Sequence, residues 1–190
     1  QIGLAEGVFH LASLCFELPS GMLADLMGRK GTLFASRCAS LLSALAMLRS
    51  SGGAGLCLAM VLNALSYNLS SGTREAMTYD SLLEAGQDVH YLRLSALQNI
   101  CWRGAGAAAL LCAGVTAALG WQRAYGLDML VDGLALAVVL GLAEPAVGAP
   151  EVRPRLRALP QGFAQCGRDA VEFLRAVPAA GRLMLVNALV

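Results

Sequence analysis

The chain has 190 residues, of which 57% are hydrophobic and only 14% are charged, and its formal net charge is +1. Soluble domains carry charge on about a quarter of their residues, so this composition predicts a chain whose main solvent is lipid. A net charge this small provides no overall field that would attract nucleic acid, and no nucleic-acid partner is expected.

Five long apolar segments predict five transmembrane spans. Backbone amides in lipid must be hydrogen-bonded within their own segment, so each span is expected to be an α-helix. The expected fold class is therefore an all-α membrane protein, a polytopic transmembrane helix bundle. A strand barrel would need short segments of alternating polarity, and these segments are long and unbroken. The expected spans are residues 2–19, 32–48, 53–72, 94–119 and 124–143.

The fifth span is followed by the longest polar segment, residues 145–180. Apolar residues at helical spacing there predict an amphipathic helix in a cytoplasmic loop, with an ordinary linker helix as the alternative. Residues 181–190 indicate the start of a further span, too short to cross about 30 Å of hydrocarbon. The chain also begins inside an apolar run, so we expect a piece of a longer protein.

Basic residues alternate between the links, which predicts the orientation of the bundle. Ten lie in the links after the first, third and fifth spans, and two lie in the other links. Because basic links are retained in the cytoplasm, the first set is expected on that side. The expected location is the cell membrane, as a multi-pass protein of a bacterial inner membrane.

The residue types that carry out catalysis or bind metals form no recognisable pattern. The six cysteines include no C-x-x-C pair, and neither histidine lies at ligand spacing. Cysteine in an apolar segment behaves as a small hydrophobe. We therefore expect no metal, no cofactor, no catalytic residues and no enzymatic activity, with a membrane enzyme that uses Arg103 and nearby acids as the alternative.

The stretch GMLADLMGRK, residues 21–30, concentrates charge in a short hinge between the first two spans. Its glycines allow backbone angles that other residues resist. Asp25 is suited to accept backbone N–H bonds near a helix N-terminus. Arg29 and Lys30 are suited to bind acids at neighbouring helix ends. Such a hinge suits a latch that opens and closes, and a simple turn with orienting charges is the alternative.

This stretch resembles motif A of the major facilitator superfamily (MFS), G-x-L-a-D-r-x-G-r-k, between helices 2 and 3. Gly21, Asp25, Gly28, Arg29 and Lys30 match, and Leu26 departs from the basic position. Glu17 with the following Pro and Gly resembles the family's E-x-P-x-G, and residues 71–86 resemble the cytoplasmic end of helix 4. The resemblance covers essentially the whole chain, as helices 2–6 and the start of helix 7 of the N-terminal half.

The resemblance implies a gate. Asp25 would meet a helix of the C-terminal half of the same protein, a partner that this chain lacks. Arg29 would pair with Glu75 or Asp80, and Glu17 would belong to the same gate.

Two departures bear on ion coupling. Asn68 stands where the family's motif B has an arginine linked to proton coupling. Residues 104–118 contain glycines but lack the proline of motif C, which is typical of antiporters. The resemblance therefore does not imply proton-driven efflux.

Ionisable residues inside spans predict a substrate or ion cavity, because a charge at mid-bilayer costs at least about 2.5 kcal/mol. Arg103 lies nine residues past Leu94, about 13 Å deep, and Asp132 is about as deep from the other side. We expect these two to face the cavity and pair, or to bind substrate and proton in turn; a static ion pair is the alternative. The expected cavity residues are Asn68, Asn99, Arg103, Asp128 and Asp132.

The expected function is secondary active transport of a small solute by alternating access, with efflux of drug-like molecules as the favoured case by resemblance. The expected partners are the solute, protons and the lipid bilayer. A non-transporting receptor-like or scaffold relative, or an inert truncated fragment, is the alternative.

Overall fold

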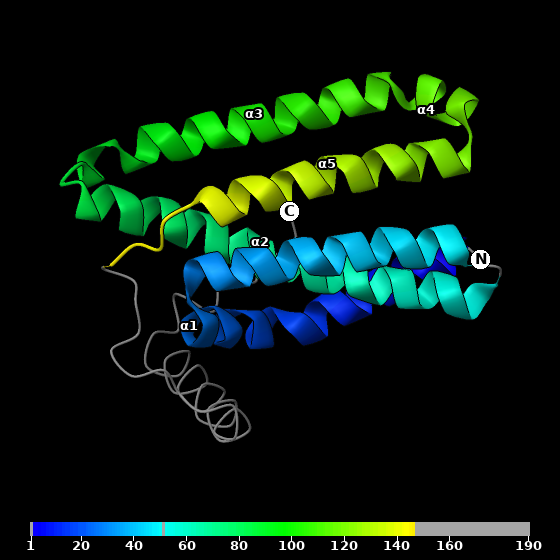
Figure 1. Cartoon of the computed structure of the whole chain (residues 1–190), viewed down its shortest axis with the longest axis horizontal. Coiled ribbons are helices and arrows are strands. Elements are labelled where there is room, and N and C mark those ends of the chain that lie inside the picture. The colour runs from blue at the N-terminus through cyan, green and yellow to red at the C-terminus, as the bar shows by residue number, and fades with distance from the viewer. Residues whose placement is uncertain (1, 51, 147–190) are drawn as a thin grey trace, which may run out of the picture. The chain divides into compact units, whose positions relative to one another are not determined.

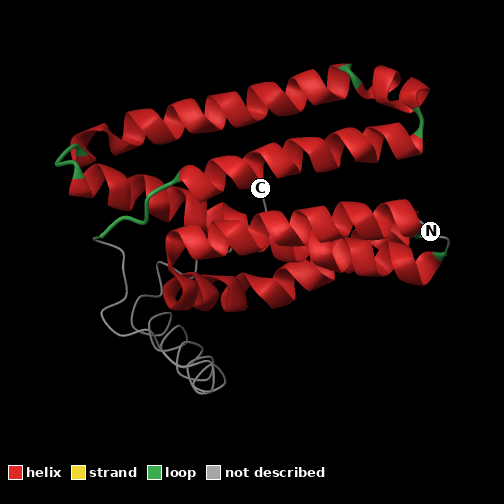
Figure 2. Ribbon diagram, in the orientation of Figure 1, coloured by secondary structure: helices red, strands yellow, loops and turns green. Residues whose placement is uncertain are grey.

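We describe the fold from a computed structural model, which defines residues 2–50 and 52–146. These residues form helices and no strands (Figures 1 and 2), which confirms the all-α class. The predicted amphipathic helix within 145–180 and the predicted span start at 181–190 lie outside the described residues. The elements are α1 (Ile2–Arg49), α2 (Gly53–Glu84), the 3-10 helix η1 (Asp88–His90), α3 (Tyr91–Leu111), α4 (Ala113–Leu119) and α5 (Trp121–Gly141).

Three helical segments are long and apolar enough to cross a membrane: Met27–Arg49, α2 and α5. A fourth is added if α3 and α4, which meet at a 54° bend, count as one span. Residues 2–19, the first expected span, lie in the N-terminal part of α1 and are not among these three. The number, length and composition of the three or four segments able to cross are those of a multi-pass membrane protein.

The fourth expected span is not one straight helix, because the chain bends at Cys112. The Cys112 amide still donates to the carbonyl oxygen of Ala108, while its own carbonyl oxygen accepts from Val115 and Thr116. The Thr116 hydroxyl donates to the carbonyl oxygen of Ala113 at 2.8 Å, inside the short helix α4.

Helix α1 contains a sharp turn at Gly28, where the chain reverses direction (Figure 1). Gly28 has φ 79° and ψ 168°, and it divides α1 into a first arm, residues 2–27, and a second arm, residues 29–49. The Thr32 hydroxyl donates to the carbonyl oxygen of Gly28 at 2.8 Å. The loop expected between the first two spans is thus reduced to a single non-helical residue.

Small residues bring α1 and α2 together. Ala59 and Ala64 of α2 are fully buried, and the Ser36 hydroxyl donates to the carbonyl oxygen of Ser66 at 2.9 Å. The Ser43 hydroxyl likewise donates to the carbonyl oxygen of Ala59 at 2.8 Å. Residues without bulk let two helix backbones approach closely, and buried hydroxyls then bond across the gap.

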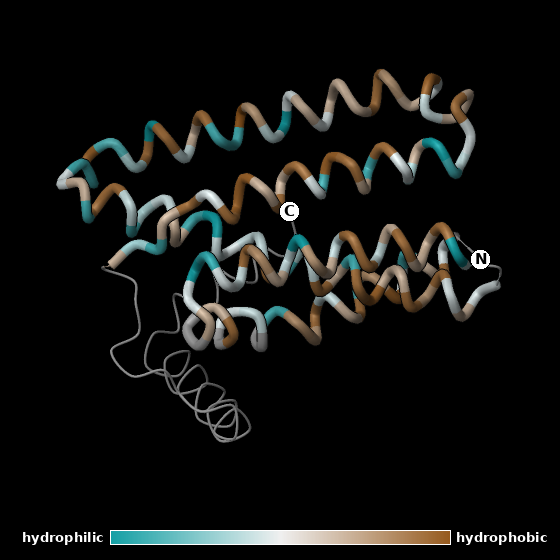
Figure 3. The backbone as a smooth tube through the Cα atoms, in the orientation of Figure 1, coloured by the Kyte–Doolittle hydropathy of each residue, from teal (hydrophilic) through white to brown (hydrophobic). Residues whose placement is uncertain are grey.

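Helix α5 packs against the second arm of α1, and α3 lies apart from α5 along most of its length (Figure 1). Leu33, Met77 and Val139 form the buried apolar cluster shared by α1, α2 and α5. Hydrophobic residues recur along the whole length of the long helices (Figure 3). No residue of α3 is buried, so its apolar side chains are available to lipid.

Candidate functional site

The Gly28 turn is held by an acid from the segment after α5. The Glu144 carboxylate accepts the backbone N–H of Arg29 at 2.5 Å through Oε1 and that of Lys30 at 2.7 Å through Oε2. These N–H groups are among the first of the second arm, where a helix has no internal acceptors for them. The positive end of the helix dipole favours an anion at this position.

Gly28 is needed for this contact as well as for the turn. A Cβ atom at Gly28 would lie 2.6 Å from Oε1 of Glu144, closer than two such atoms can approach. Its backbone angles also fall in a region that only glycine adopts readily. The turn geometry and the binding of the carboxylate therefore both require that residue 28 has no side chain.

The side chains of Arg29 and Lys30 extend the contact to two more helices. Arg29 Nε lies 3.2 Å from Oδ2 of Asp80 on α2, and both side chains are mostly buried. Asp80 is one of the two partners that the resemblance implied for Arg29. Lys30 Nζ donates to the carbonyl oxygen of Leu140, near the end of α5, at 2.8 Å.

We refer to Gly28, Arg29, Lys30, Asp80 and Glu144 as the Gly28 cluster. It joins the start of the second arm of α1 to the C-terminal part of α2 and to the chain leaving α5. The cluster contains two acids and two bases, so its formal charge is close to neutral. Chemically it is the Arg29–Asp80 ion pair together with hydrogen bonds to backbone groups, and these contacts hold three helix ends together.

Of the other expected gate residues, Glu17, Gly21 and Glu75 are not part of this cluster. Glu17 and Gly21 lie exposed on the first arm of α1, where the carbonyl oxygen of Glu17 accepts the Ser20 hydroxyl at 2.9 Å. Glu75 is exposed and lines a cleft described below. Asp25 is within α1, and its side chain lies outside what the structure describes.

The expected cavity residues are dispersed rather than gathered. Asn68 is buried, and its Nδ2 donates to the Ser13 hydroxyl and to the carbonyl oxygen of Ala64, both at 2.8 Å. It therefore fastens α2 to the first arm of α1. Arg103 is exposed on α3, and Asp128 is exposed on α5.

The expected pairing of Arg103 with Asp132 is wrong. Oδ1 of Asp132 lies 3.2 Å from Nη1 of Arg37, on the second arm of α1. The reason is helix packing: α5 contacts α1, whereas α3 makes no close contact with α5. Asp132 itself is buried, with 6% of its surface exposed.

Sequence reasoning missed Arg37 and Glu144. Arg37 lies in a segment able to cross a membrane, eight residues past the start of the second arm at Arg29, which is about 12 Å along the helix. A base at that depth is a signal, because it requires a partner. Glu144, just after the fifth span, had a weaker signal, since many acids follow helix ends.

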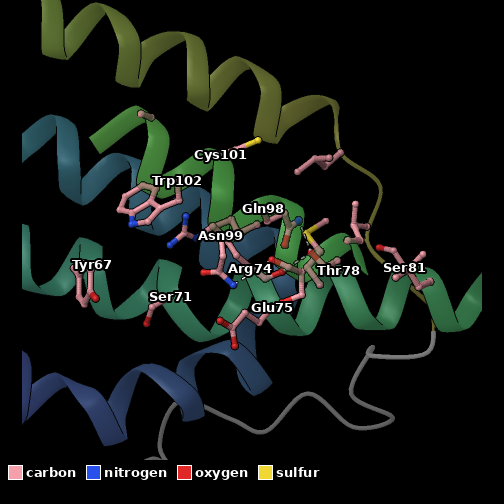
Figure 4. A pocket seen from close by; sticks show the side chains of 17 residues that line it. Tyr67, Ser71, Arg74, Glu75, Thr78, Ser81, Gln98, Asn99, Cys101 and Trp102 are labelled. Atoms are coloured by element: carbon pink, nitrogen blue, oxygen red, sulfur yellow. Dashed lines mark hydrogen bonds between the residues drawn. The ribbon is translucent and has the colours of Figure 1, made fainter. Parts of the chain in front are cut away.

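A cleft of about 900 Å³ lies mainly between α2 and α3 (Figure 4). Figure 4 shows Arg74 beside Trp102, and the guanidinium carbon of Arg74 lies 5.0 Å from the indole centroid. Arg74 Nε also donates to the carbonyl oxygen of Ser70 at 3.2 Å. Of the expected cavity residues, Asn99 lines this cleft. Its other polar lining residues are Tyr67, Ser71, Glu75, Thr78, Ser81, Ser95 and Gln98.

Within residues 2–50 and 52–146, no group of three or more His, Cys, Asp or Glu side chains is placed to hold a metal ion. No family model matches the chain, and neither a characterised protein nor a solved structure is significantly similar to it. Function is therefore argued from the Gly28 cluster, the buried Arg37–Asp132 pair and the cleft.

Proposed function

We propose that this chain is part of a secondary transporter of the MFS type, which moves a small solute across a membrane by alternating access. The observation that carries the proposal is the Gly28 cluster. Three helix ends meet there through charges and backbone N–H groups, beside the buried apolar cluster of Leu33, Met77 and Val139. The residues involved include three of the motif A positions that resemble the family's gate.

The chemistry of the cluster suits a contact that opens and closes. The side chains of Arg29 and Asp80 are 21% and 14% exposed, so water reaches both, and an ion pair that water reaches contributes about 0–1 kcal/mol. Each hydrogen bond from an exposed helix end likewise contributes a net stability of only about 0.5–1.5 kcal/mol, because water can replace its partner. A cluster of such contacts holds the helix ends together and still allows them to separate on the timescale of a transport cycle.

The cleft between α2 and α3 is the proposed place for solute contact. It combines a guanidinium group, a carboxylate, amide side chains and an indole ring in one concave surface. Ligand sites commonly combine apolar walls with a few polar groups of this kind. A small amphipathic solute fits this lining, and efflux of drug-like molecules is the case that we favour.

The other half of the same protein completes this proposal. Asp25 would contact a helix of that half when the gate is closed, with the lipid bilayer of a cell membrane around both. A receptor-like relative that binds solute without moving it is the second candidate, favoured by the open, polar cleft alone.

The full-length protein, reconstituted in lipid vesicles, tests the proposal. Exchange of labelled dyes, drugs and sugars is measured for the wild type and for Asp25→Asn, with solute binding measured in parallel. We expect exchange of at least one solute in the wild type and its loss in Asp25→Asn, with binding retained. Binding without exchange in the wild type would instead establish the receptor-like function.

A further inference from the structure

Two contacts orient the side chain of Arg74 at the cleft between α2 and α3 (Figure 4). Its guanidinium carbon lies 5.0 Å from the centroid of the Trp102 ring, and its Nε donates to the carbonyl oxygen of Ser70 at 3.2 Å. A guanidinium group stacks on an aromatic face because its positive charge is attracted to the ring. One contact comes from α3 and the other from α2 itself, so together they set the plane of the guanidinium group.

These contacts leave the terminal nitrogens of Arg74 available to a ligand. A guanidinium group carries N–H donors on Nη1 and Nη2 as well as on Nε. Within residues 2–50 and 52–146, no acid forms an ion pair with Arg74, whereas Arg29 and Arg37 each pair with an acid of a neighbouring helix. Arg74 is therefore a base of the cleft whose terminal donors no described acid uses.

The lining around Arg74 is largely apolar. Met77, Leu94 and Leu142 contribute aliphatic surface, and Glu75 is the only acid among the described lining residues. Successive residues of a helix point about 100° apart, so Arg74 and Glu75 leave α2 in different directions. The cleft measures about 900 Å³, a volume typical of sites for small ligands. There is thus room for an apolar group beside the guanidinium.

We propose that this cleft binds an oxyanion attached to an apolar body. Arg74 is the anion-binding residue, because Nη1 and Nη2 can donate in parallel to two oxygens of a carboxylate or phosphate. Trp102 is a positioning residue, because its ring holds the guanidinium group. The apolar body lies against Met77 and Leu94. Binding makes and breaks no covalent bond.

The lining favours an anion over a cation. The face of Trp102 is an attractive place for a ligand cation, but Arg74 already occupies it. Glu75 repels an anion, yet its side chain is exposed and water weakens that repulsion. Arg74 is exposed as well, but it adds directional hydrogen bonds to its charge, and charge-assisted hydrogen bonds are about twice as strong as neutral ones.

Two kinds of molecule carry this chemistry. A soluble aromatic carboxylate would reach the cleft from water, and an anionic lipid would reach it from the bilayer, because no residue of α3 is buried. In the first case the inference names the class of solute for the proposed transport function, and its role in transport rests on that function. In the second case the cleft is a lipid site, whether or not the protein moves a solute.

Equilibrium dialysis with radiolabelled naphthoate tests the soluble case. The full-length protein is held in nanodiscs of phosphatidylcholine, and empty nanodiscs give the background. Naphthylmethylamine and naphthylmethanol share the ring system and replace the negative charge by a positive charge or by none. We expect naphthoate to bind the wild type about tenfold more tightly than either analogue, as hydrogen bonds to a charged group predict. Tighter binding of the amine would overturn the proposal.

Variants assign the binding to Arg74 and Trp102. Arg74→Gln should weaken naphthoate binding about tenfold, and Arg74→Lys, which keeps the charge without the planar fork, should fall between it and the wild type. The control Arg123→Gln removes an exposed base of α5 and should leave binding unchanged. Trp102→Leu should weaken binding, whereas Trp102→Phe should retain it, because a phenyl ring also holds a guanidinium group. Naphthoate binding that is unchanged in Arg74→Gln overturns the proposal.

Native mass spectrometry of protein released from nanodiscs with phosphatidylglycerol tests the lipid case. Retention of this lipid by the wild type and its loss from Arg74→Gln, without naphthoate binding, would assign the oxyanion to a lipid headgroup. Absence of both ligands, or lipid retention that Arg74→Gln does not change, overturns the proposal. Exchange of a cationic dye together with that result would leave the proposed transport function standing. Naphthoate binding without exchange of any solute would count against transport and leave the anion site standing.

Discussion

Gly28 shows at the scale of one residue how the turn and the site depend on each other. Its φ of 79° allows the chain to reverse within α1, and the absence of a side chain lets Glu144 reach the N–H groups of Arg29 and Lys30. Gly21, seven residues earlier, lies in regular helix with open space around it. Two glycines of one motif thus meet different physical demands.

We predict that Gly28→Ala destabilises the protein by about 1–3 kcal/mol, because alanine resists this conformation and displaces the carboxylate. Gly21→Ala is the matched control, and it should leave stability unchanged or raise it by about 0.5–1 kcal/mol, as alanine favours a helix interior. Thermal unfolding in detergent measures both changes. Equal midpoints for the two variants would contradict this account of the Gly28 turn.

Part of the candidate site could be predicted from local sequence. The stretch GMLADLMGRK predicted a hinge with glycine and an adjacent base, and the family resemblance implied Asp80 as one of two partners of Arg29. The Glu144 contact could not be predicted, because it depends on how the end of α5 lies against α1. The predicted partner of Asp132 was wrong for a related reason, because the packing of α5 on α1 determines which base lies beside Asp132.

At the scale of elements, α1 and α2 form the best-packed pair. Their contact surface contains alanines and serines, with Ala59 and Ala64 fully buried and two serine hydroxyls bonded across it. Large apolar side chains would weaken this contact. In lipid, helices associate through close packing and hydrogen bonds rather than through removal of apolar surface from water.

We predict that Ala59→Leu separates α1 and α2 and destabilises the protein by about 1–3 kcal/mol through overpacking. It would also displace the Ser43 hydroxyl from its 2.8 Å contact with the Ala59 carbonyl oxygen. The control is Ala54→Leu, an exposed position on the same helix. Unfolding midpoints that fall equally in both variants would show that the interface is not the cause.

The helices themselves could be predicted from runs of apolar residues, but the side of each helix that packs against its neighbours could not. Helix α5 is apolar on nearly every side: Val131 is 63% exposed, while its neighbour Asp132 is 6% exposed. No periodic pattern marks the buried side of such a helix. The bend at Cys112 was missed because a hydropathy run does not register one residue of altered backbone.

At the scale of the whole described bundle, many large apolar side chains face outward, and two polar residues of the spans are buried. Leu110 and Leu111 are 79% and 88% exposed, whereas Asn68 and Asp132 are buried. Exposed apolar surface of this kind marks contact with lipid. Asp132 follows the rule that ionisable groups in spans face the protein interior, whereas Arg103 and Asp128 are exposed in the described bundle. Contact between the outer surface and lipid explains why only 14% of the residues are charged.

We predict that the links at the two ends of α2 lie on opposite sides of the membrane. Single cysteines at Gly52 and at Gln87, both exposed, are introduced into a variant without native cysteines. A membrane-impermeant thiol reagent added outside intact cells should label the first and should label the second only after lysis. Labelling of both from outside would contradict the orientation predicted from the basic residues.

The measurement that tests the central claim most directly is solute exchange in vesicles containing charge-swapped full-length protein. Arg29→Asp and Asp80→Arg should each reduce exchange about tenfold, which corresponds to about 1.4 kcal/mol, because each breaks the 3.2 Å pair between α1 and α2. The double swap should recover most of the rate by restoring the pair in reverse. Wild-type exchange in both single variants would contradict a gate built on the Gly28 cluster.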